Sequence, residues 1–151
     1  MSEIILMLHV FFGVLCLLGS VWLIVEVSHA SVANARRIRN FSLGIAAVMW
    51  VAYLIAGYWY VVFYHVDKAI ILKGPWPFAH DFFMETKEHM VIVLLLLVTY
   101  LPLVAANDLV ANRAARNLML GVLAMIAVTV LAAEGMGAVI AMGVKVALMP
   151  K

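Results

Sequence analysis

Three histidines in this sequence stand at the edges of long apolar segments that contain few other ionisable residues. They are His9, His65 and His89, and Glu85 precedes His89 by four residues. On a helix, that spacing places a carboxylate and an imidazole on one face. With a rise of about 1.5 Å per residue, His9 and His89 lie roughly 7 Å inside their segments. His65 ends its segment in the same layer, so the three imidazoles are expected to converge from separate helices.

Imidazoles that converge at one depth can hold a metal ion or a haem. Imidazole is a ligand for zinc, copper, iron and nickel, and an added carboxylate favours iron or zinc. Two inward histidines are enough to hold a haem through axial ligation. We therefore expect His9, His65 and His89 to bind haem b or a transition metal (iron, copper or zinc), with Glu85 as a further metal ligand. The residue types leave open which of these cofactors is bound, and whether the protein is an enzyme.

A second candidate is Glu134, the one charged residue between Leu118 and Val144. An ionisable side chain within a membrane span is costly and is by default a functional candidate. Two interpretations stay open. Glu134, together with Tyr100 on the preceding apolar segment, contacts a proton path or a quinone. Alternatively, Glu134 is protonated and hydrogen-bonded to Tyr100 or Ser20.

The remaining ionisable residues have simpler interpretations. We expect Lys87 to extend toward water, because a long side chain near a helix end can do so. We expect Glu88 to point away from the histidine face and His80 to be exposed in a loop. Glu26 and His29 have the E-x-x-H spacing that supplies two ligands on one face in some helical bundles. An ion pair between Glu26 and a nearby arginine is the favoured interpretation.

The apolar segments themselves indicate a membrane protein. Of 151 residues, 68% are hydrophobic and 12% are charged, whereas soluble domains have about half and about a quarter. The expected spans are about 4–28, 41–65, 84–106 and 118–147, each near the length that crosses a bilayer as a helix. We expect an all-α integral membrane protein, a single domain over residues 1–151 folded as a four-transmembrane-helix up-down bundle. The first segment follows an uncharged Met-Ser and Glu3 and is longer than a signal-peptide core, so it is expected to be a span.

Charge and small residues suggest how the helices are arranged. Arginines cluster in the first and third loops, at positions 36, 37, 39, 113 and 116. The positive-inside rule then places both termini outside, as in a bacterial inner membrane. His9, Gly13, Cys16 and Ser20 form one stripe of small or polar residues that should pack against other helices. Gly74-Pro75-Trp76-Pro77 interrupts the helix and predicts a short interfacial segment between the second and third spans.

The layout resembles a small four-helix membrane family that is linked in some members to cytochrome oxidase assembly. That family has a histidine early in the first span, Tyr-His near the outer end of the second and a histidine near the start of the third. Here those landmarks are His9, Tyr64-His65 and His89. The sequence departs from that family at the inner starts of the second and fourth spans, where arginines replace histidines. The layout is also similar to small four-helix b-type cytochromes.

These observations support two hypotheses about function. The first is a haem b or metal-binding redox protein with a histidine site near the outer face, exchanging electrons with quinol or a partner. The second is a non-catalytic accessory or cofactor-assembly subunit of a larger respiratory membrane complex. The expected partners are the lipid bilayer, a quinone, and other membrane subunits or further copies of the chain. No phosphate-binding glycine motif, CxxC pair or basic aromatic patch occurs, so nucleic acid is not an expected partner.

Overall fold

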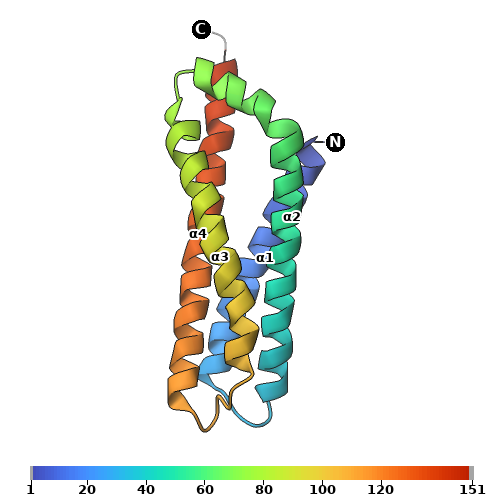
Figure 1. Cartoon of the computed structure of the whole chain (residues 1–151), viewed down its shortest axis with the longest axis vertical. Helices are drawn as coiled ribbons and strands as arrows, with labels where there is room; N and C mark the ends of the chain where they lie inside the picture. The colour runs from blue at the N-terminus through green and yellow to red at the C-terminus, as the bar shows by residue number, and fades with distance from the viewer. Residues whose placement is uncertain (1, 150–151) are drawn as a thin grey trace.

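A computed structural model describes residues 2–149, which form a bundle of four long helices (Figure 1). These helices are α1 (Ser2–Ser28), α2 (Ala35–Lys73), α3 (Glu85–Ala105) and α4 (Arg113–Leu148). A short π-helix, η1 (Ala79–Met84), runs directly into α3. Four helical segments, the third counted from Ala79, are long and apolar enough to cross a membrane. The predicted all-α, four-helix architecture is confirmed.

Helices that are consecutive in the sequence are neighbours in the bundle. Within the described residues, α1 packs on α2 and α4, and α3 packs on the same two helices, whereas α1 and α3 make no close backbone contact. The start of α1, the end of α4 and the segment 74–84 lie toward one end of the bundle, here named the terminal end (Figure 1). The two tight loops lie at the opposite end, here named the arginine end because all five arginines are in or beside those loops.

The last turns of α2 extend beyond the expected span and cross the terminal end toward α4 (Figure 1). A side chain at Gly74 would collide with Ala147 of α4, so glycine permits this close approach. The helix ends at Lys73 because Pro75 disfavours helical geometry in the residue before it. The predicted break is therefore confirmed.

The segment that was expected to lie in the interface is partly incorporated into the bundle. Phe78 and Phe82 are exposed, as an interfacial segment requires. In contrast, Ala79, His80 and Met84 of η1 are buried, and η1 packs against α2, α3 and α4. A π-helix is rare and often marks a functional site, and here it turns one histidine inward.

The hydrophobic core consists of two separate clusters. The larger one includes Leu23, Met49, Leu94 and Val130 and reaches the arginine end. The smaller one lies at the terminal end and consists of Tyr64, Ile71, Ala79, Met84 and Ile140. The clusters are separated by residues 85–93 between η1 and the middle of α3, and by residues 131–138 on α4. Polar side chains occupy this intervening layer.

The first loop is held by polar contacts at the arginine end. Arg37 Nη2 lies 2.7 Å from Glu26 Oε2, so the predicted ion pair between Glu26 and an arginine is confirmed. The buried Asn34 amide donates to the Glu26 carboxylate and to two backbone carbonyls. These bonds satisfy carbonyls that the end of α1 leaves free.

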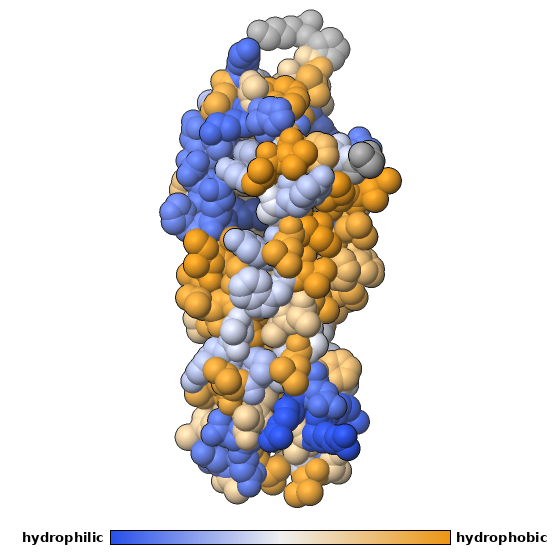
Figure 2. Space-filling model, turned by 45° about the vertical axis from the view of Figure 1, so that its right-hand side comes forward, coloured by the Kyte–Doolittle hydropathy of each residue, from blue (hydrophilic) through white to orange (hydrophobic). Residues whose placement is uncertain are grey.

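The surface of the bundle has an apolar middle and hydrophilic ends (Figure 2). Large apolar side chains are exposed on every helix, including Leu18, Val61, Leu96 and Val128. A soluble monomer rarely exposes contiguous apolar surface on this scale. A helical bundle that contacts lipid acyl chains needs this distribution of apolar side chains over its surface.

Candidate functional site

The layer between the two core clusters contains four partly buried ionisable side chains from three helices: His9 of α1, Lys87 and Glu88 of α3, and Glu134 of α4. We name these four residues the polar layer. The layer lies between helices that include α1 and α3, which make no close backbone contact with each other in the described residues.

Two of the charges are accommodated by glycines on facing helices. A Cβ atom on Gly13 would overlap the carboxylate of Glu134, so α4 inserts this side chain against bare backbone of α1. A Cβ atom on Gly137 would lie 3.0 Å from Lys87 Nζ. Lys87 therefore crosses to α4 instead of extending toward water, and the prediction for it is wrong. Its positive charge attracts Glu134, but within residues 2–149 no carboxylate oxygen lies within 4.0 Å of Nζ.

His9 faces inward, as its stripe predicts. Gly13, Cys16 and Ser20 of the same stripe are buried. The His9 ring is half-buried, and its Nδ1 lies 3.1 Å from the carbonyl oxygen of Ala52 on α2. Because a carbonyl only accepts hydrogen bonds, Nδ1 donates, which leaves Nε2 of the neutral ring as an acceptor.

A cavity of about 370 Å³ opens between α1, α2 and α3 at this level. Its polar lining is His9, Lys87 and Glu88, and Oε1 of Glu88 is shielded and has no hydrogen-bond partner within the described residues. A shielded carboxylate oxygen without a partner is costly. A ligand that donates a hydrogen bond would remove that cost.

The remaining walls of this cavity are aromatic and aliphatic. Tyr53, Trp59 and Tyr60 of α2 line one side, and Tyr60 lies beside Glu88. The opening is bordered by Val61 and Ile92, which are 77% and 57% exposed. Because these two side chains are exposed and apolar, the cavity opens on the apolar surface of the bundle. Flat aromatic walls beside a few polar groups are typical of small-molecule sites.

The structure does not bring the three predicted histidine ligands together. His65 and His89 are exposed, and Nδ1 of His89 lies 2.7 Å from the carbonyl oxygen of Glu85 on its own helix. Within residues 2–149, no three His, Cys, Asp or Glu side chains form a group that could hold a metal ion. Tyr100 is also exposed, and Ser20 bonds to the Cys16 carbonyl, so neither is seen paired with Glu134.

His80 is the residue whose environment the sequence analysis misjudged. It was expected to be exposed in a loop, but it is 3% exposed because η1 turns its ring into the terminal-end core. Nδ1 of His80 lies 3.0 Å from the hydroxyl of Tyr64, and Nε2 lies 3.8 Å from Oε1 of Glu85. The predicted metal ligand Glu85 therefore faces His80 and not His89. The sequence analysis treated residues 79–84 as part of a loop and did not predict the π-helix that places these groups.

The Tyr64–His80 pair continues toward the cavity through stacked rings. Tyr60 lies one helical turn before Tyr64, and their ring centroids are 5.1 Å apart at an interplanar angle of 20°. Tyr60 in turn lines the cavity. The site thus combines a ligand-sized space with a row of aromatic rings that leads to the Tyr64–His80 pair at the terminal end, where the Glu85 side chain is 52% exposed.

Comparisons with protein family models, with curated proteins and with solved structures gave no match for this chain. The resemblance to the two four-helix families therefore stays a prediction, and the site is interpreted from its own chemistry.

We expect Tyr64→Phe to destabilise the terminal end. Because Nε2 of His80 is directed at Glu85, the Tyr64 hydroxyl donates to Nδ1 of His80. Removing that hydroxyl leaves the buried Nδ1 atom without a donor. The expected loss is about 1–3 kcal/mol, measured as a lower midpoint of thermal unfolding in detergent. Tyr58→Phe is the control because Tyr58 is 56% exposed on the same helix. Equal midpoints for the two variants would contradict the assignment.

Proposed function

We propose that the protein binds a quinone or quinol in the membrane, with the ring in the cavity between α1, α2 and α3. The observation that carries this proposal is the lining of that cavity, in which His9, Lys87 and Glu88 stand opposite aromatic side chains. A quinone presents the matching chemistry, because it is a flat ring with two oxygen atoms and an apolar tail.

Each polar group of the cavity has a role toward the oxygens of such a ring. The Lys87 ammonium donates to a carbonyl oxygen of the quinone form. The unpartnered Glu88 oxygen accepts from a hydroxyl of the quinol form, and Nε2 of His9 provides a second acceptor. Because the site has both donors and acceptors, it can bind the quinone and the quinol. A site where the ring gains or loses electrons and protons has to bind both forms.

The bilayer supplies the ligand, and the chain provides an opening to it. Val61 and Ile92 at the mouth are exposed on the apolar surface, so an isoprenoid-like tail can remain in lipid while the ring enters. With the arginine end inside, the site belongs to the outer half of the membrane. We propose that electrons pass between the ring and a partner membrane subunit, which makes the chain an accessory quinone-binding subunit of a larger complex.

The geometry gives less support to haem b or a metal ion held by the three histidines. His65 and His89 are exposed and would have to turn inward to meet His9, and Glu85 faces His80. Haem ligation stays a prediction with a simple test, which is the absorption spectrum of the purified protein before and after reduction with dithionite. A Soret band that is lost in His9→Ala would favour the haem form over the quinone proposal.

Removing the cationic donor should weaken quinone binding. We expect Lys87→Met to lower the affinity for a short-chain quinone by about tenfold or more, as loss of a charge-assisted hydrogen bond does. Isothermal titration in detergent measures this effect. Lys68→Met is the matched control, because Lys68 is exposed near the terminal end of α2 and does not line the cavity. Unchanged affinity in Lys87→Met would contradict the proposal.

Filling the cavity without touching its charges is an independent test. Gly57 lines the cavity, and a Cβ atom there meets no other atom within 4 Å. Gly57→Leu should therefore fold normally and bind quinone at least about tenfold more weakly, because the added side chain occupies ligand space. Gly135→Leu, also in open space but outside the cavity, should bind as the original protein does. Equal binding by both variants would place the ligand elsewhere.

A further inference from the structure

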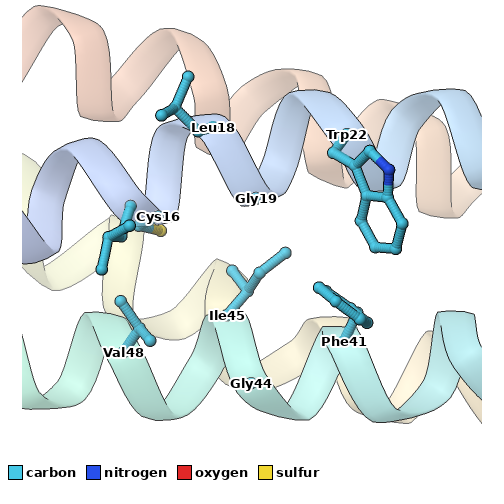
Figure 3. A pocket seen from close by; sticks show the side chains of 9 residues that line it. Cys16, Leu18, Gly19, Trp22, Phe41, Gly44, Ile45 and Val48 are labelled. Carbon is cyan, nitrogen blue, oxygen red and sulfur yellow. The ribbon is translucent and has the colours of Figure 1, made fainter.

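A second hollow lies on the outside of the bundle, between α1 and α2, and it does not share residues with the quinone cavity. It has a volume of about 430 Å³ and is lined by Leu15, Cys16, Leu18, Gly19, Trp22, Phe41, Gly44, Ile45 and Val48. Figure 3 shows Gly19 and Gly44 on the two facing helices, with Ile45 between them. Gly44 faces open space, whereas Gly19 allows Ile45 of α2 to approach α1 closely.

The groove ends toward the arginine end in a group of aromatic and cationic residues. The Trp22 and Phe41 rings approach each other there, with centroids 4.2 Å apart (Figure 3). The Arg37 guanidinium lies over the Trp22 ring, 6.0 Å from its centroid. Arg37 is paired with Glu26, whereas the neighbouring Arg36 is exposed. Five arginines stand at this end against two carboxylates, Glu26 and Asp108.

We propose that this groove binds an anionic phospholipid, with one acyl chain along α1 and α2 and the phosphate at the arginine end, close to Arg37 above Trp22 and within the positive charge to which the exposed Arg36 contributes. From Leu15 to Trp22 the apolar stretch is about 10 Å long, which suits part of an acyl chain. Guanidinium groups pair well with phosphate, and basic sites between transmembrane helices are known to recognise anionic head groups. This inference does not depend on the quinone proposal.

Charge favours a lipid over a second copy of the chain as the occupant. Two copies in one membrane share the same orientation, so packing them through this groove would bring their arginine ends together. That arrangement places like charges side by side, which is unfavourable. An anionic lipid instead neutralises the arginines while its acyl chain covers the apolar groove.

The test is native mass spectrometry of the full chain in detergent, titrated with phosphatidylglycerol or phosphatidylcholine. We expect preferential binding of one phosphatidylglycerol. Arg36→Gln should weaken phosphatidylglycerol binding about fivefold and phosphatidylcholine binding less, because the choline cation offsets the phosphate charge of the second lipid. Gly44→Leu should weaken binding of both lipids, since a Cβ atom at Gly44 meets nothing within 4 Å and a larger side chain fills the groove. Gly121→Leu, likewise in open space but on α4, should change neither.

Three outcomes would overturn the proposal. The first is that the original protein binds the two lipids with equal affinity, which would show that the arginines do not select an anionic head group. The second is identical lipid binding by Gly44→Leu and Gly121→Leu, which would place the lipid outside the groove. The third is a dimer that Gly44→Leu converts to a monomer while lipid binding persists, which would make a second copy the occupant. Arg36 is exposed, so Arg36→Gln should fold normally. If Gly44→Leu does not fold, the lipid affinities of Arg36→Gln still decide the test.

Discussion

The central physical constraint on this bundle is the cost of holding charges inside an apolar helical assembly. A lysine or a carboxylate at the centre of a membrane span costs about 2.5–3.5 kcal/mol, and the polar layer contains both. The chain meets this cost through shape, because Gly13 leaves room for the Glu134 carboxylate and Gly137 leaves room for the Lys87 ammonium. The two opposite charges attract without direct contact, so neither is fully neutralised by the protein.

This incomplete pairing connects the fold to the proposed function. If Lys87 and Glu134 formed a tight pair, the layer would be a structural contact only. Instead, Lys87 lines an open cavity beside a Glu88 oxygen that has no partner in the described residues. The same layer separates the two apolar clusters. A ligand with oxygen atoms on a flat ring would complete the polar contacts that the helices leave open, and the apolar mouth gives it access from the bilayer.

Much of the fold was predictable because bilayer-length apolar segments leave little choice of architecture. The helix break at Gly74-Pro75, the inward stripe through His9 and the Glu26–Arg37 pair all follow from local spacing. The site was harder to predict, since it depends on which faces meet. A helix periodicity cannot reveal that η1 is a π-helix, and that extra residue per turn is what buries His80 and directs Glu85 toward it. Likewise, the direction of Lys87 depends on a gap at Gly137, fifty residues away in the sequence.

The most direct test of the central claim is photoaffinity labelling with an azidoquinone, followed by mapping of the labelled peptides. The account predicts adducts within the three segments that line the cavity, which are residues 6–9 of α1, 53–61 of α2 and 84–92 at the junction of η1 and α3, and loss of these adducts when unlabelled quinone competes. Adducts confined to other faces, or labelling that unlabelled quinone does not reduce, would contradict it.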